Sequence, residues 1–160
     1  MLDLKTILHP TDFSNTSECA FRLACSLARD HGARLVLLHV VELPAPAYGE
    51  GTAPVTVIQI SLEAEREALD HIQAPQGVSM DRMLLEGDAA YEILRIAKES
   101  EADLIVLGTH GRTGLGRFLL GSVAEQVLRR APCPVLTVKS GVRPPIVETP
   151  VSETLAETKG

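Results

Sequence analysis

The chain of 160 residues contains no tryptophan, and aromatic residues make up only 3% of it. So few rings argue against the stacking platforms that bind RNA or single-stranded DNA. Basic residues are also in the minority, since the formal net charge is −6. Nucleic-acid binding usually needs a basic face, so we expect no nucleic-acid partner. A small ligand in a locally positive pocket remains compatible with this composition.

Cysteine is scarce, and long hydrophobic runs are absent. Cys19, Cys25 and Cys133 are widely spaced and form no CxxC pair, which is typical of reduced thiols and not of a disulfide framework or a zinc site. No window approaches the roughly 20 apolar residues of a membrane span. Asp3 stands where a signal peptide would carry positive charge. We therefore expect a cytoplasmic protein without membrane contact.

Short apolar runs alternate with segments of helical spacing along the chain. Strands are predicted at residues 6–9, 35–41, 78–85, 104–107 and 134–138, and helices at about 15–31, 58–72, 89–97 and 123–130. Residues 10–14 are predicted to end the first strand, Gly32 to end the first helix, and Asp88 to cap the third. Residues 42–55, rich in proline and glycine, form a long loop and a candidate lid.

This alternation predicts an α/β fold with one doubly wound, five-stranded parallel sheet and helices on both faces. The expected strand order is 3-2-1-4-5. The domain is expected to span residues 1–140, with a flexible tail at 141–160. Ligands in such sheets lie where strand order reverses. That places Pro10, Thr11 and Asp12, after the first strand, opposite the residues after the fourth: Gly108, Thr109, His110 and Gly111.

A glycine-rich segment joins the fourth strand to the last helix. Gly108, Gly111 and Gly121 are followed by Ser122 and Val123. Unpartnered N–H groups and the dipole at a helix N-terminus favour an anion, so this segment predicts a phosphate cradle. Residues 122–125 also fit a capping box, in which the Ser122 hydroxyl would serve the helix and not a ligand. Both interpretations of Ser122 stay open.

The spacing Gly-x2-Gly-x9-Gly-Ser resembles the nucleotide motif of the universal stress protein family, in its ATP-binding branch. Residues 6–14 (TILHPTDFS) and 120–139 (LGSVAEQVLRRAPCPVLTVK) also resemble that family. The resemblance covers about residues 1–140 and implies a single α/β domain that is usually a homodimer. It implies that Asp12 contacts the nucleoside and that the backbone at Val40 or Val41 faces adenine. It also assigns ribose and phosphates to five residues: Gly108, Gly111, Gly121, Ser122 and Val123.

Charged residues near the glycines add weaker signals. Arg112 and Arg117 are candidates to neutralise phosphates, although surface arginines are more often only solvated. Mg²⁺, mostly hydrated, is then the expected charge partner of ATP. His9, His39 and His110 lie at or near strand ends, where a structural role is commoner than a metal site. No P-loop lysine and no convincing general base are present, so no catalytic residue is assigned.

Three functions remain open at this point. The first is an ATP-binding regulatory module of the stress response. The second is a slow ATP hydrolase or nucleotidyl-transfer enzyme on the same site. The third is a nucleotide-free interaction module in which the glycines only shape the loop. The last strand, Val135–Val138, would be an apolar sheet edge, so we expect a two-fold symmetric homodimer through it.

Overall fold

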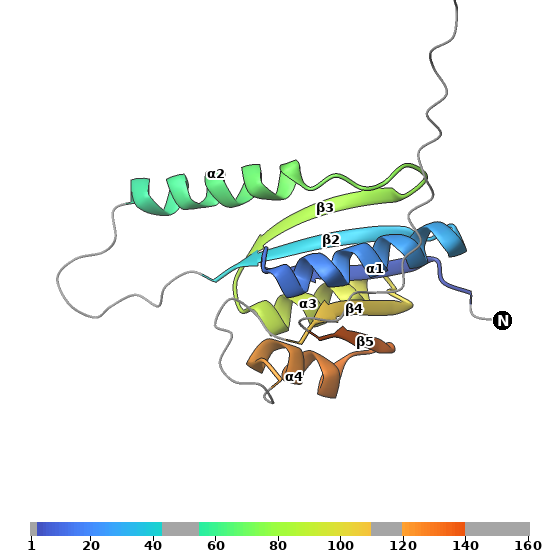
Figure 1. The fold of residues 1–160 in the computed structure, drawn as a ribbon. Helices are drawn as coiled ribbons and strands as arrows, with labels where there is room; N and C mark the ends of the chain where they lie inside the picture. Colours follow the sequence, from blue (N-terminus) through green and yellow to red (C-terminus); the bar gives the residue numbers. More distant parts are fainter. Residues whose placement is uncertain (1–2, 43–54, 110–119, 140–160) are drawn as a thin grey trace, which may run out of the picture.

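The computed structural model describes residues 3–42, 55–109 and 120–139, and side chains throughout these ranges except at 55–61 (Figure 1). Strands and helices alternate along the chain. The strands are β1 (Thr6–Thr11), β2 (Arg34–Val41), β3 (Ser79–Glu86), β4 (Leu104–Gly108) and β5 (Val135–Val138). The helices are α1 (Asn15–His31), α2 (Val55–His71), α3 (Ala89–Glu99) and α4 (Ser122–Arg130).

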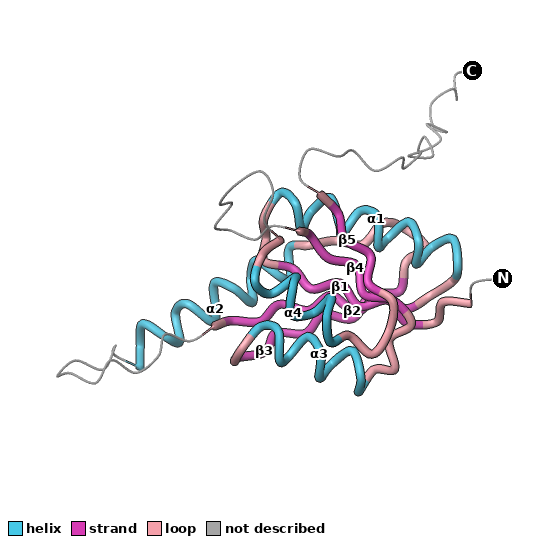
Figure 2. Tube along the Cα trace, turned by 90° about the horizontal axis from the view of Figure 1, so that it is seen from below, coloured by secondary structure: helices cyan, strands magenta, loops and turns pink. Residues whose placement is uncertain are grey.

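The strands form one sheet in the order β3-β2-β1-β4-β5, and every pairing is parallel. The predicted fold class and strand order are therefore confirmed. Parallel neighbours need crossover connections, and right-handed crossovers carry α1 and α2 to one face and α3 and α4 to the other. The layers can be followed in Figure 2. Along the β3 edge, α2 lies outermost (Figure 1).

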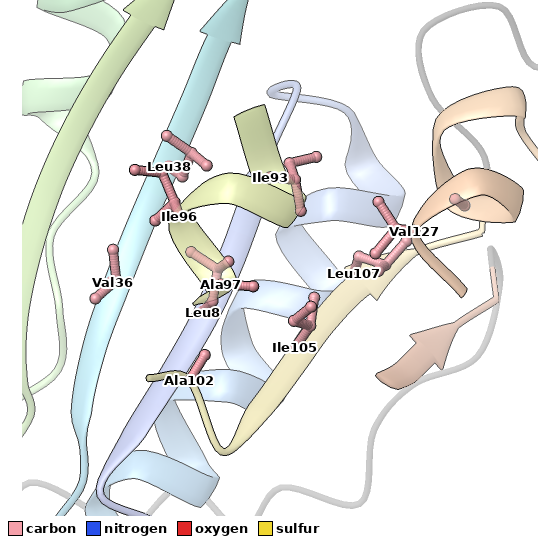
Figure 3. Close-up of a cluster of buried hydrophobic side chains, with 11 residues drawn as sticks. Leu8, Val36, Leu38, Ile93, Ile96, Ala97, Ala102, Ile105, Leu107 and Val127 are labelled. Carbon is pink, nitrogen blue, oxygen red and sulfur yellow. The ribbon is translucent and has the colours of Figure 1, made fainter. Parts of the chain in front are cut away.

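Side chains alternate between the two faces of the sheet, and each face has its own core. On the face covered by α3 and α4, a buried cluster joins Leu8, Ile105 and Val127 with residues from β2 and both helices (Figure 3). On the α1 face, Ile7 and Leu35 pack against small residues of the helix. Successive strand residues point to opposite faces, so Leu8 and its neighbour Ile7 serve different cores.

The first strand is longer than predicted. It continues through Pro10, which pairs with Leu38 of β2, and ends at Thr11. The register between β1 and β4 includes only Ile7 and Leu8 of β1. Proline has no N–H to donate, but at residue 10 the ladder between β1 and β4 has already ended, so proline is tolerated there. The prediction that residue 10 breaks the strand was wrong for this reason.

Two predicted helix ends are confirmed. Gly32 ends α1 in the left-handed conformation, with φ of 64°. Asp88 caps α3, where its Oδ1 accepts a hydrogen bond from the Tyr91 N–H at 2.7 Å. On α3 the buried residues are Ala90, Ile93, Ile96 and Ala97, while Ala89 is half-buried.

Candidate functional site

The carboxyl ends of β1 and β4 lie side by side, and the chain leaves them in opposite directions. After β1 it enters α1 on one face, and β4 is followed by α4 on the other. This is the point of reversal at which open α/β sheets bind ligands. The predicted residues Thr11 and Asp12 come to it from β1, and Gly108 and Thr109 from β4.

The turn after β1 is built around Asp12. Its Oδ1 accepts hydrogen bonds from the Ser14 N–H at 3.1 Å and the Ser14 hydroxyl at 2.6 Å. The Ser14 Oγ in turn accepts from the Ser17 N–H at 3.2 Å and caps α1. Between them, Phe13 adopts a left-handed backbone with φ of 61°, which is rare for a residue with a large side chain. The turn thus holds the Asp12 carboxylate in place. It also caps the N-terminus of α1 with the side chain of Ser14.

Thr11 anchors this turn to the sheet. The Thr11 Oγ1 accepts hydrogen bonds from the Phe13 N–H at 3.1 Å and the Ser17 hydroxyl at 2.9 Å. The Thr11 carbonyl accepts a hydrogen bond from Nδ1 of His39, on β2, at 2.7 Å. Sequence reasoning assigned His39 no part in the site, because the contact joins residues 28 positions apart and depends on strand register.

Next to this turn, β2 extends past the end of β1. The β1–β2 register ends at the pair Thr11–His39, while β2 continues through Val40 and Val41 alongside β3. Both valines are half-buried, and the Val41 carbonyl accepts a hydrogen bond from the Gly87 N–H at 3.1 Å. The described part of β2 therefore continues past the β1 ladder at these two positions, and the Val41 carbonyl is bonded on the β3 side.

The N-terminus of α4 is tied to the end of β4. The Gly121 N–H donates to the Thr109 carbonyl at 2.8 Å, and the Thr109 N–H donates to the Val138 carbonyl at 2.9 Å. Thr109 is buried, and Val123 packs against the core cluster. The first residue of α4, Ser122, is exposed. The start of α4 is therefore held at the carboxyl edge of the sheet.

The predicted capping box at residues 122–125 is wrong. The N-cap of α4 is Gly121, whose carbonyl accepts from the Glu125 N–H at 2.9 Å. Ser122 is thus already helical, one position too late for its hydroxyl to cap, and no side chain in the described part of the chain caps this end. By contrast, α1 and α3 are capped by Ser14 and Asp88. The N–H groups at the start of α4 keep their capacity to bind an anion.

Gly108 has a structural explanation of its own. A Cβ at this position would lie 2.9 Å from Cγ2 of Thr16 and 3.3 Å from the backbone N of Ser17. The end of β4 therefore touches the first turn of α1 closely enough to exclude a side chain. Three other predicted site residues, His110, Gly111 and Arg112, lie outside the described residues, as does Arg117. Residues 43–54 of the candidate lid (42–55) lie outside them too.

The sequence of this chain matches the universal stress protein family over residues 3–139. The chain belongs to the universal stress protein family. A universal stress protein of Methanocaldococcus jannaschii is 40% identical over 141 residues, which cover 84% of this chain and 82% of that protein. The predicted family is therefore confirmed.

Solved universal stress proteins share this fold. The crystal structure of one from Burkholderia pseudomallei is 36% identical, with a TM-score of 0.69, and covers 86% of this chain and 98% of that chain. Another, solved in complex with cAMP, is 26% identical, with a TM-score of 0.63, and covers 86% of this chain and 98% of that chain. The family thus includes a member that binds an adenine nucleotide.

Two titratable side chains of this universal stress protein, His9 and Cys25, are buried and have shifted pKa values. His9 on β1 is fully buried, and its Nδ1 donates to the Val106 carbonyl at 2.8 Å. Burial lowers the pKa of His9 from 6.5 to about 4, against the Val106 hydrogen bond and the Asp12 charge, which raise it. Burial also raises the pKa of the Cys25 thiol to about 12. The described residues hold no group of three or more metal-ligating side chains.

All three cysteines are free thiols. Cys133 is half-buried beside the α3–α4 core, and burial raises the pKa of its thiol, as expected for a residue that packs and does not react. Among the described residues, no helix combines the length and apolar character needed to cross a bilayer.

Proposed function

We propose that this universal stress protein binds ATP, with Mg²⁺, between the β1–α1 turn and the N-terminus of α4. The observation that carries the proposal is the start of α4. In the described part of the chain, the N-terminal N–H groups of α4 have no side-chain cap, because the N-cap is Gly121, while Ser14 and Asp88 cap α1 and α3. Helix donors at the carboxyl edge of a parallel sheet favour a phosphate group. The relative solved with cAMP supports an adenine nucleotide as the ligand class.

The nucleoside end of the proposed site lies on the β1 side of the crevice. The turn orients the Asp12 carboxylate, which can accept hydrogen bonds from ribose hydroxyls, as acidic residues do in other nucleotide folds. Of the two expected contacts to adenine, the backbone of Val40 suits the role better, because β1 has ended beside it and the Val41 carbonyl already accepts from the Gly87 N–H. Pro10 and Thr11 shape this side of the crevice from β1.

The phosphate end lies at α4. Ser122 and Val123 would contribute backbone N–H groups there, beside Gly121, whose own N–H is bonded to the Thr109 carbonyl. The Ser122 hydroxyl is exposed and not engaged as a cap. Gly108 and Thr109 hold the strand end beside it. His110, Gly111 and Arg112 complete the proposed set from the sequence motif. Because the described residues form no carboxylate cluster, Mg²⁺ would be held by the phosphates and water.

The proposed role is regulatory, in the stress response, and not efficient catalysis. The described site offers helix donors and one oriented carboxylate, whose Oδ1 already accepts two hydrogen bonds from Ser14. A general base must be free to take a proton within hydrogen-bond reach of the reacting group. The three free cysteines support a cytoplasmic location, where thiols stay reduced.

Release of bound nucleotide tests the proposal directly. Freshly purified protein is denatured, and any released nucleotide is identified by mass spectrometry beside a folded Gly121→Leu variant. We expect ATP from the wild type and none from the variant. No nucleotide from the wild type and no heat on titration with Mg-ATP would refute the proposal in favour of a nucleotide-free interaction module. Multiple-turnover phosphate release that Gly121→Leu abolishes would instead identify a slow hydrolase.

A second substitution separates the phosphate site from helix stability. In Gly121→Asp, a carboxylate would cap α4 as Asp88 caps α3, so the free energy of unfolding should change by only a few tenths of a kcal/mol. The same carboxylate would occupy the donors and repel phosphate, so ATP affinity should fall at least about tenfold. Unfolding in urea and calorimetric titration measure the two quantities. Unchanged ATP affinity in Gly121→Asp would remove the α4 N-terminus from the site.

A further inference from the structure

The His39 side chain connects three elements at the nucleoside end of the crevice. It is 5% exposed, at the end of β2. Its Nδ1 lies 2.7 Å from the Thr11 carbonyl oxygen of β1. Its ring centroid lies 4.4 Å from that of Phe13, in the turn after β1. Its Nε2 lies 3.4 Å from Oε2 of Glu65, on α2.

The hydrogen bond to Thr11 identifies one ring nitrogen of His39 that carries a proton. A carbonyl oxygen only accepts, so Nδ1 carries a proton and donates it. Nε2 then faces the Glu65 carboxylate, with which it forms an ion pair when the ring is doubly protonated. A doubly protonated His39 is therefore held from both nitrogens, by the end of β1 and by α2.

His39 contacts the two residues that flank Asp12 in the chain. Thr11 precedes Asp12 and accepts the His39 hydrogen bond, and Phe13 follows it and packs on the His39 ring. Phe13 has a left-handed backbone, with φ of 61°, and such a conformation persists only where the surroundings enforce it. The His39 ring and the Thr11 hydroxyl, which accepts from the Phe13 N–H, are those surroundings.

We propose that His39 is a positioning residue for the nucleoside end of the site: it holds the turn that aims the Asp12 carboxylate, and Glu65 of α2 holds His39. This inference rests on the proposed nucleotide-binding function. Through Glu65, α2 at the edge of the sheet would then also affect the affinity for the nucleoside.

A pair of similarly shaped substitutions separates positioning from packing. Asparagine and leucine branch alike at Cγ, but only asparagine can place an N–H donor where Nδ1 of His39 lies. If His39 positions the turn through the Thr11 carbonyl, His39→Asn preserves nucleoside binding and His39→Leu does not. If His39 only fills space beside Phe13, the apolar leucine is tolerated at least as well as asparagine.

The experiment is calorimetric titration of the nucleotide-stripped full chain with adenosine and, separately, with Mg-ATP. We expect His39→Leu to weaken both ligands by the same factor, about tenfold, because the loss of one hydrogen bond to a buried carbonyl is of that size. We expect His39→Asn to stay within about threefold of the wild type. Gly121→Leu should show the opposite pattern, losing ATP and retaining adenosine.

Two results would overturn the inference while leaving the proposed function intact: His39→Leu binding adenosine as the wild type does, or His39→Asn losing as much affinity as His39→Leu. A wild type that binds neither adenosine nor ATP would instead end the proposed function, and the inference with it.

A second pair of variants applies if His39→Leu fails to fold. Glu65→Ala removes the α2 partner of His39, and Glu67→Ala removes an exposed carboxylate two residues along the same helix. We expect Glu65→Ala to weaken adenosine about threefold relative to Glu67→Ala, the scale of one partly screened polar contact. Equal affinities in the two variants would overturn the inference.

Discussion

His9 is buried, and its Nε2 is the one buried side-chain polar atom without a hydrogen-bond partner among the described residues. Desolvation lowers the pKa of His9 to about 4. The folded protein therefore holds a neutral imidazole at pH values where the unfolded chain would bind a proton. His9 therefore makes the free energy of unfolding depend on pH between its folded pKa of about 4 and its ordinary value of 6.5.

We predict that His9 destabilises the protein as pH falls from 6.5 towards 4. Since the unfolded state binds more protons in this window, the free energy of unfolding rises with pH, and about 3 kcal/mol is lost on acidification. His9→Asn keeps an N–H donor for the Val106 carbonyl but does not titrate. Urea unfolding at pH 7, 5.5 and 4.5 should show a steeper loss in the wild type than in His9→Asn. Parallel pH profiles would contradict the prediction.

At the scale of elements, the contact between β4 and α1 brings the two halves of the site together. Gly108 ends β4 against Thr16 and Ser17 in the first turn of α1. The same helix turn carries the Ser14 cap that binds Asp12. Close approach of the end of β4 to this turn therefore holds the strand next to the turn that carries Asp12.

We predict that Gly108→Ala lowers the free energy of unfolding by about 1–3 kcal/mol, the usual cost of overpacking. The new Cβ would lie 2.9 Å from the Thr16 Cγ2 and 3.2 Å from the Thr16 carbonyl carbon. Urea unfolding measures the loss. The double variant Gly108→Ala/Thr16→Ser removes the methyl group and should recover part of it, relative to Thr16→Ser alone. An unchanged free energy of unfolding in Gly108→Ala would contradict this prediction and leave ligand contact as the role of Gly108.

The elements that sequence reasoning predicted well are those with strong local signals. Helical spacing, the Gly32 and Asp88 end signals and the alternation of strands and helices defined the topology, because right-handed crossovers leave few alternatives. Element ends were harder. Pro10 stays in β1 because the hydrogen-bond ladder between β1 and β4 has already ended at that residue. At α4, the N-cap is Gly121 and not Ser122. Both outcomes depend on partners that the local sequence does not reveal.

The candidate site was predictable only in part, for a related reason. Glycine spacing predicted a phosphate position, and the place of Asp12 after a strand predicted a nucleoside contact; both stay predictions. His39 and Glu65 had no local signal, because their contacts join β1, β2 and α2 across the fold. The packing of Gly108 on Thr16 likewise joins residues far apart in sequence.

At the scale of the whole molecule, β5 is an edge strand. It pairs with β4 on one side and ends the described sheet on the other. Leu136, in the middle of β5, is 36% exposed. An apolar edge of this kind invites pairing with another chain, and a two-fold axis through it would bury the edge in both copies. We propose a homodimer through Val135–Val138.

We predict that Leu136→Glu gives a monomer, because two like charges would face each other across the two-fold axis. Sedimentation velocity at micromolar concentration should show a dimer for the wild type and a monomer for the variant. Tyr91→Glu is the matched control, since Tyr91 is an exposed ring on α3, away from the β5 edge. A wild type that sediments as a monomer, or a Leu136→Glu variant that remains a dimer, would rule out this interface.

The hydrogen bond between the Gly121 N–H and the Thr109 carbonyl has a consequence for how this protein can diversify. It joins the two ends of the stretch from 110 to 120 at 2.8 Å. When the ends of a connection are already joined, each doubling of its length costs only about 0.6 kcal/mol. We therefore expect changes in the length of this connection to cost the sheet and α4 little stability.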